Sequence, residues 1–118
     1  MADAGLFIGW GEVVRGRESK SLDVFQQAVT YYGSLQQDGT IESMESVFLE
    51  PHGGELQGFF LLRGEREKLS KLRVDQEFVR MSARAGLVVE GFGVVGAALG
   101  DGLQEAVETF QQATSELT

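Results

Sequence analysis

The feature that most constrains the fold of this chain is an internal repeat with one constant spacing. Shifting the sequence by 48 positions places residues 13–16 (VVRG) on residues 61–64 (LLRG). The same shift carries residues 41–44 (IESM) onto residues 89–92 (VEGF). A repeat that keeps one register over two separate stretches indicates two copies of one supersecondary unit.

Each copy reads as strand, helix, strand. The first copy covers residues 6–49, with strands at 6–14 and 41–49 and a helix from Ser21 to the Asp38-Gly39 pair. The second covers residues 55–97, with strands at 55–63 and 87–97 and a helix over 64–85 that Gly86 closes as Gly39 closes the first. Residues 50–54 (EPHGG) predict a tight hairpin between the copies, because proline cannot donate to a ladder and glycine accepts positive φ. A last helix is predicted over residues 101–117.

Apolar residues at three- and four-residue steps mark the buried side of the two internal helices. The first helix presents Leu22, Phe25, Val29 and Tyr32, with Ala28 and Leu35 beside them, and the second presents Leu69, Leu72, Val79 and Ala83, flanked by Phe78 and Met81.

This element order predicts an α+β fold: a ferredoxin-like β-α-β-β-α-β antiparallel sheet with two helices on one face, plus a C-terminal helix. With 118 residues the chain is predicted to form a single domain over residues 1–118.

The two faces of the predicted sheet differ in bulk. The even-numbered positions are large and apolar and are assigned to the helix-covered core: Ile8, Trp10, Met44, Phe48, Leu56, Phe60, Leu62, Phe92 and Val94. The odd-numbered positions mix glycines with a patch that is too apolar to face water, formed by Val13, Val47, Phe59, Leu61 and Val95. We therefore predict a homodimer in which a second copy covers this face by a two-fold interface.

In this element order and patterning the chain resembles the dimeric α/β-barrel superfamily of ferredoxin-like proteins, in which two such sheets pack face to face. Members of that superfamily include cofactor-independent oxygenases, small isomerases, haem-handling proteins and proteins without an assigned activity. The resemblance implies the architecture and leaves the function open.

Composition excludes several classes of function. The net charge of −8 argues against binding to nucleic acid, and the sequence has no cysteine, no long apolar segment and no secretory signal. We therefore predict a cytoplasmic protein with no membrane partner. Seven of the ten lysines and arginines lie within residues 63–84, where four acids leave a charge of +3, against −11 elsewhere.

Residues 91–96 (GFGVVG) match the G-x-G-x-x-G pattern of dinucleotide sites, but the match is rejected. That pattern needs its glycines in the turn between a strand and a helix, and here the first two lie within a predicted strand.

The glycines suggest a different site. Glycine inside a strand marks a close approach of another group, and the first and last strands are neighbours in this topology. We predict that a small organic molecule binds between the two sheets of the dimer, at Gly9, Gly11, Ser43, Glu45, Gln57, Phe59, Gly91 and Gly93. The alternative is that the partner's sheet packs tightly against the glycines.

No catalytic residue, metal site or cofactor is predicted. His52 is the only histidine and is expected to be an exposed turn residue, with too few neighbouring ligands for zinc. Glu42 and Glu90 start opposite edge strands and are expected to be far apart. Glu12 and Glu45, in mid-strand, are better placed for acid–base chemistry.

Two further functions remain open. One is a cofactor-independent enzyme, such as a monooxygenase or isomerase, with Glu45 as its proton shuttle. The other is a structural or regulatory module that binds an acidic partner through the basic second helix, including Lys68 and Lys71.

Overall fold

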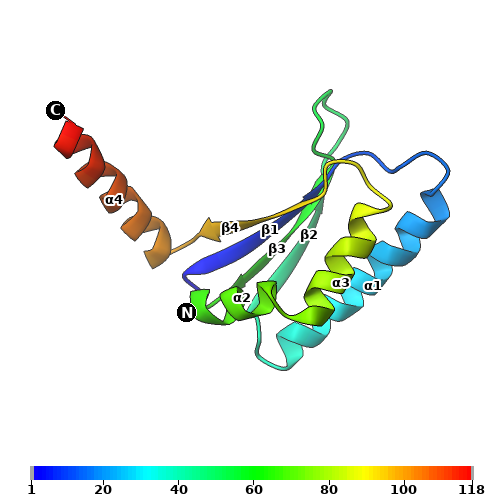
Figure 1. The fold of residues 1–118 in the computed structure, drawn as a ribbon, viewed down its shortest axis with the longest axis horizontal. Coiled ribbons are helices and arrows are strands. Elements are labelled where there is room, and N and C mark those ends of the chain that lie inside the picture. Colours follow the sequence, from blue (N-terminus) through cyan, green and yellow to red (C-terminus); the bar gives the residue numbers. More distant parts are fainter. Residues whose placement is uncertain (1, 118) are drawn as a thin grey trace.

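The computed structural model describes residues 2–117 and contains four strands and four helices in that range (Figure 1). Their order along the chain is β1 (Ala4–Trp10), α1 (Glu18–Gln37), β2 (Ser43–Phe48), β3 (Gly58–Gly64), α2 (Arg66–Arg73), α3 (Gln76–Gly86), β4 (Gly93–Ala98) and α4 (Asp101–Leu117). No helix in this range combines the length and the apolar character that crossing a membrane requires.

The strands form one antiparallel sheet in the order β2-β3-β1-β4, with α1, α2 and α3 on one of its faces (Figure 1). Leu6 at the middle of β1 lies opposite Leu62 of β3 and Gly96 of β4, which sets the register across the sheet. The predicted ferredoxin-like α+β fold is confirmed.

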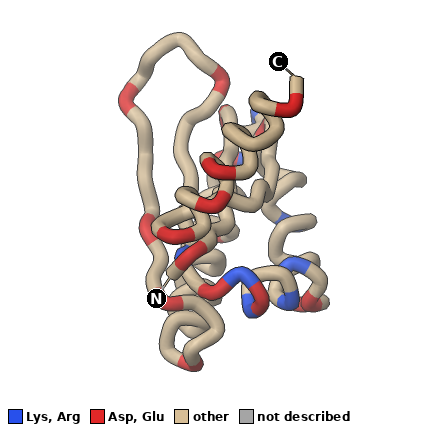
Figure 2. The backbone as a smooth tube through the Cα atoms, turned by 90° about the vertical axis from the view of Figure 1, so that its left-hand side faces the viewer, with Lys and Arg blue, Asp and Glu red and all other residues tan. Residues whose placement is uncertain are grey.

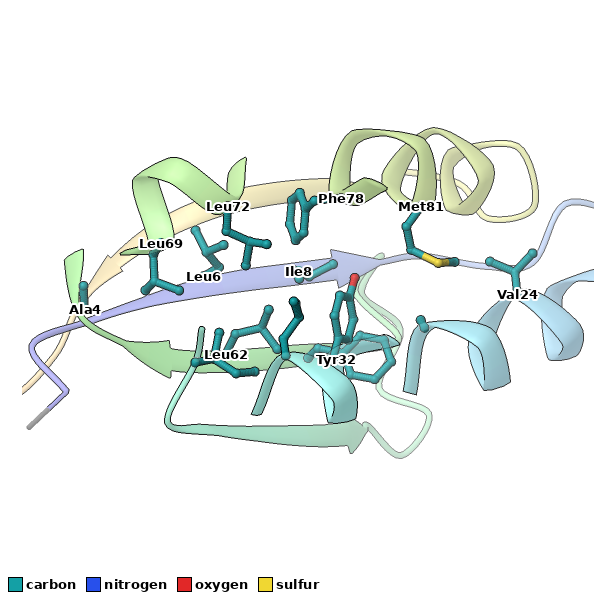
Figure 3. Packing of buried hydrophobic residues seen from close by; sticks show 14 of the residues in the cluster. Ala4, Leu6, Ile8, Val24, Tyr32, Leu62, Leu69, Leu72, Phe78 and Met81 are labelled. Atoms are coloured by element: carbon teal, nitrogen blue, oxygen red, sulfur yellow. The ribbon is translucent and has the colours of Figure 1, made fainter. Parts of the chain in front are cut away.

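The core lies between this sheet and the three helices. Leu6 and Ile8 of β1 and Leu62 of β3 are buried, with Leu62 wholly inaccessible to solvent. Figure 3 shows these residues on the side of the sheet from which Leu72 of α2 and Phe78 of α3 approach. The even-numbered positions of the strands therefore face the helices, as predicted.

The second internal helix differs from the prediction, because it is broken into α2 and α3 at Val74-Asp75. The Asp75 carboxylate accepts hydrogen bonds from the backbone N–H groups of Glu77 (3.1 Å) and Phe78 (3.4 Å), and so caps the start of α3. The break turns α3 relative to α2. As a result Phe78 and Met81 are buried, whereas Val79 (50% exposed) and Ala83, predicted on the buried side, are exposed.

The buried side of α1 is also shifted from the predicted one. Leu22 (64% exposed) and Val29 lie towards solvent, and the buried residues follow steps of four, four and three: Val24, Ala28, Tyr32 and Leu35. The helix starts at Glu18, about one turn earlier than predicted.

Two residues lie on the other side of the sheet from the one predicted. β1 ends at Trp10, and pairing resumes only as an isolated bridge between Val13 and Val89, on the helix side. Residues 49–57 form a long loop and not a tight hairpin, and Leu56 in it packs over Gly9 on the helix-free face. In both cases the strict alternation of faces stops where the strand stops.

The end of α3 is also different from the prediction. Gly39 has φ 83° and ends α1 in the left-handed conformation, as expected, but Gly86 does not and is the last residue of α3. β4 then begins only at Gly93, because residues 88–92 form the bridge and a turn in which Gly91 has positive φ.

Helix α4 forms over the predicted residues but projects from the rest of the molecule (Figure 1). The radius of gyration is 16.1 Å, whereas a compact chain of about 100 residues has roughly 13 Å. Charge is divided accordingly in Figure 2, in which the cations gather on α2 and α3 while α4 and the loop between β2 and β3 carry acids only.

Candidate functional site

The structure contains an apolar cavity between the sheet and the helices α1 and α3. Its volume is about 140 Å³. Ile8, Trp10 and Phe60 of the sheet form its floor, and the walls come from both helices and from the segment before β4. The complete lining is Ile8, Trp10, Val13, Ser21, Leu22, Val24, Phe25, Ala28, Tyr32, Phe48, Phe60, Met81, Ala85, Val88, Val89 and Phe92.

Aromatic rings form a continuous cluster along this lining. Phe25 stacks on Phe60 with ring centroids 5.3 Å apart, and Trp10 meets Phe60 at 5.2 Å. Phe48 closes the cluster at the outer end, 5.1 Å from Phe25 and 6.0 Å from Trp10. Tyr32 continues it inwards at 5.0 Å from Phe60. Such rings give a ligand large, rigid contact surfaces.

The outer end of the cavity is lined by apolar side chains that solvent reaches. Leu22 of α1 and Phe48 of β2 are 64% and 69% exposed, and Val13 is 40% exposed. Exposed apolar residues that border a cavity form an entrance through which an apolar molecule can pass.

Only three polar side chains contribute to the lining among the described residues: the hydroxyls of Ser21 and Tyr32 and the indole of Trp10. Burial raises the pKa of the Tyr32 hydroxyl above its ordinary value, and the neighbouring Tyr31 raises it further. Tyr32 therefore stays neutral at any physiological pH and can donate a hydrogen bond. The described part of the lining contains no carboxylate, imidazole, amine or guanidinium group.

The opposite face of the sheet carries most of the residues predicted to bind a ligand. The residues of this face form rows across the strands. In one row Glu45 of β2 pairs with Leu61 of β3, and Phe7 of β1 lies between Leu61 and Val95 of β4. The next row is Val47, Phe59, Gly9 and Gly93. Phe7 and Phe59 stack with centroids 4.8 Å apart. We call this surface the open face.

Three of the predicted site residues are already engaged by their own chain. A Cβ atom on Gly9 would lie 2.7 Å from the Phe7 ring, and one on Gly11 would meet the backbone carbonyls of Glu55 and Glu90. The Glu45 carboxylate binds the Arg63 guanidinium at 3.0 Å, with both side chains partly exposed. Gly93 has free space over it.

The remaining predicted residues fall into two separate places. Ser43 starts β2 beside Arg63, at one end of the open face. Gln57 and Gly91 lie at the other end, where Gly91 and Gly11 help to line a wide groove with Glu12, Glu55 and Glu90. His52 is an exposed turn residue, as predicted: its ring accepts from the Gly54 N–H (3.1 Å) and contacts the Leu56 carbonyl oxygen (2.6 Å).

Sequence reasoning missed the helix-side cavity because it assigned the residues that line it to a filled core. The even-numbered alternation identifies Trp10, Phe48 and Phe60 as facing the helices, but whether a cavity remains depends on how closely α1 and α3 pack over them.

Comparisons with known proteins establish the fold and nothing more specific. No protein-family model and no curated protein matches the chain. Among solved structures, a dimeric ferredoxin-like protein of unknown function from Jannaschia sp. is 12% identical, with a TM-score of 0.61, over 82% of this chain and 98% of that one. A dimeric protein of unknown function with a ferredoxin-like fold, from Bacteroides fragilis, is 11% identical, with a TM-score of 0.59, over 81% and 96%.

A third solved structure has an assigned activity. SnoaB, a cofactor-independent oxygenase from Streptomyces nogalater, is 9% identical, with a TM-score of 0.50, over 84% of this chain and 93% of that one. At these identities the likeness places this chain in the ferredoxin-like fold, and its function rests on its own residues.

Proposed function

We propose that this protein binds a small, neutral, apolar molecule in the cavity between its sheet and its helices, and that it works as a homodimer assembled through the open face. The observation that carries the proposal is the cavity itself, which is lined by aromatic and aliphatic side chains and opens to solvent past Leu22 and Phe48.

The size of the cavity limits the ligand. Its volume is about 140 Å³. An engineered apolar cavity of roughly 150 Å³ stays dry and takes up benzene. A single aromatic ring or a short branched alkyl chain therefore suits this cavity, and a larger molecule would need to leave part of itself outside the entrance.

The lining also selects for a neutral ligand. A charged group would lose its hydration without gaining a counter-ion from the described lining residues, which costs several kcal/mol. The Tyr32 hydroxyl can donate a hydrogen bond to a carbonyl or ether oxygen, so a ring that carries one such acceptor fits the polarity of the site.

The homodimer is supported by the open face. An apolar band crosses this face, and among residues 2–117 the helices α1, α2 and α3 all lie on the opposite side of the sheet (Figure 1). The band consists of Phe7, Val47, Phe59, Leu61 and Val95. Two of the solved structures with this fold are described as dimeric. We assign the predicted site residues Gly9, Phe59 and Gly93 to this interface, and binding of a ligand between the sheets stays a prediction that needs the dimer.

A catalytic role receives less support. Glu45, the predicted proton shuttle, lies on the open face and is paired with Arg63, on the other side of the sheet from the cavity. Catalysis by a general acid or base needs that group within hydrogen-bonding reach of the substrate. Binding is therefore the function that the geometry favours.

The basic helices also serve their own chain. Lys68 donates to the carbonyl oxygen of Gly39 (3.1 Å), Arg73 to that of Val94 (3.1 Å), and Arg66 pairs with Glu105 (3.4 Å). These cations hold elements of the fold together, which leaves fewer of them for an acidic partner.

Trp10 allows a direct test, because it is the only tryptophan and lines the cavity. We expect titration with toluene to change Trp10 fluorescence with saturation at one molecule per chain. Ala85→Leu, which fills the cavity, should weaken binding on the order of tenfold, about 1.4 kcal/mol.

The matched control is Ala83→Leu, the same change on the exposed side of α3. It should leave toluene binding unchanged. Equal binding by the two variants, or no saturable change of Trp10 fluorescence in the unmodified protein, would disprove the cavity as the ligand site.

A further inference from the structure

The C-terminal helix α4 has a strongly divided surface. Leu103, Val107, Phe110 and Leu117 recur at steps of four, three and seven, so they share one side of the helix, which we call the α4 stripe. The acids Asp101, Glu105, Glu108 and Glu116 lie around the other side.

The α4 stripe is exposed in the single chain. Leu103 and Val107 are about half exposed, and Phe110 is 73% exposed. Gly102 is the only buried residue among those described in α4. An amphipathic helix whose apolar side faces water is not stabilised by its own chain and needs a partner.

Backbone contacts at the base of α4 fix where the helix leaves the sheet. The backbone of Gly102 packs so closely on the Asp3 carbonyl group that a Cβ atom would not fit. Leu99 donates its N–H to the same carbonyl oxygen (3.2 Å), and Glu105 pairs with Arg66 of α2 (3.4 Å).

These contacts also orient the stripe. Glu105 faces α2, which belongs to the helix layer of the same subunit. Leu103 and Val107, two residues before and after Glu105, point about 160° away from it around the helix. The stripe therefore faces away from the helix layer of its own subunit.

The apolar surface of the open face continues into the α4 stripe through Leu99. Leu99, just before α4, covers Gly5 on the open face together with Leu61. Leu99, Leu103, Val107 and Phe110 then follow at steps of four, four and three residues, so one apolar line leads from the sheet along the projecting helix.

We infer that α4 is an arm that packs its stripe against the second copy of this chain. This inference rests on the proposed homodimer: the open faces form the centre of the interface, and the two arms extend it around each partner. The acid side of each arm then remains in solvent, which agrees with its lack of cations.

The test places the photo-cross-linking residue p-benzoylphenylalanine at one position at a time. At position 110, within the stripe, we expect irradiation to give a covalent dimer. At position 112, about 200° further around the helix, we expect none. The same residue at position 59, on the open face, tests whether the two open faces meet at the centre of the interface. Native mass spectrometry of each sample before irradiation gives the oligomeric state.

The outcomes separate the arm from the dimer. A covalent dimer at 59 but not at 110, or equal yields at 110 and 112, would overturn the arm and leave the homodimer in place. A monomer mass with no cross-link at 59 would overturn the homodimer, and the arm with it.

The second measurement is the dissociation constant of the dimer by analytical ultracentrifugation. Phe110→Ala should weaken the dimer about tenfold. Gln112→Ala, on the solvent side, should not. An unchanged constant in Phe110→Ala would contradict the arm.

Discussion

The two faces of the sheet are formed by alternating residues of the same strands, but one face forms the core and the other remains uncovered in the single chain. Leu62 points into the helix layer and is wholly buried, while Leu61, next to it, points to the open face and is only partly covered. The helices of the same chain cover the first face and leave the aromatic-lined cavity beneath α1 and α3, and the open face is apolar along its middle. One alternating pattern of residues can therefore specify a core on one side of a sheet and an assembly surface on the other.

The largest effect should come from the covered face. Leu62→Ala should lower the free energy of unfolding by about 2–5 kcal/mol, because it leaves a cavity at a fully buried site. Leu61→Ala is the matched control on the open face, and its smaller effect should grow with protein concentration, since it acts on association. Urea unfolding at several protein concentrations measures both. Equal losses of unfolding free energy in the two variants, independent of protein concentration, would contradict the assignment of one face to the core and the other to association.

The second effect concerns association. Phe59→Arg places a charge at the middle of the open face, beside Phe7. We expect it to convert the dimer into a monomer while the circular dichroism spectrum stays that of a folded protein, since burying an unpaired charge in an interface costs several kcal/mol. Arg63 already lies at the edge of that face, so Arg63→Lys serves as the control that keeps the charge. A variant that remains dimeric would show that the interface lies elsewhere.

The smallest effect should arise outside both surfaces, in the turn after α1. The Asp38 carboxylate accepts hydrogen bonds from the Thr40 hydroxyl (2.6 Å) and the Thr40 N–H (2.9 Å), and these hold the pKa of Asp38 below its ordinary value. A carboxyl whose pKa is lowered by folding contributes stability above its unfolded pKa and loses it as the pH falls through the folded value.

Asp38→Asn should therefore be slightly less stable than the unmodified protein at neutral pH, and the two should converge in acid. Urea midpoints across the acidic range measure this, with no change in the dimer dissociation constant. A difference in urea midpoint between the two proteins that persists in acid would show that these hydrogen bonds stabilise the fold independently of the charge on Asp38.

Much of this fold could be predicted from local patterns. The internal repeat and the alternation of strand residues identify the element order, the antiparallel sheet and the face that carries the helices, because side chains in a strand alternate with a period of two. The α4 segment is recognisable from its apolar period and its acidic start.

What could not be predicted depends on where regular structure stops. Val13 and Leu56 lie beyond strand ends, so the alternation no longer fixes their face. The break between α2 and α3 depends on Asp75 acting as a cap within a continuous helical pattern. The cavity depends on how closely two helices pack on the sheet, which is a property of the tertiary structure and not of any single segment.

The central claim is that each subunit binds the apolar molecule in its own cavity, without a contribution from the second copy. The most direct test is titration of monomeric Phe59→Arg with toluene, followed by Trp10 fluorescence. We predict saturation at one molecule per chain with an affinity close to that of the dimer. Loss of binding in a folded monomer would contradict the claim and would place the ligand between the sheets.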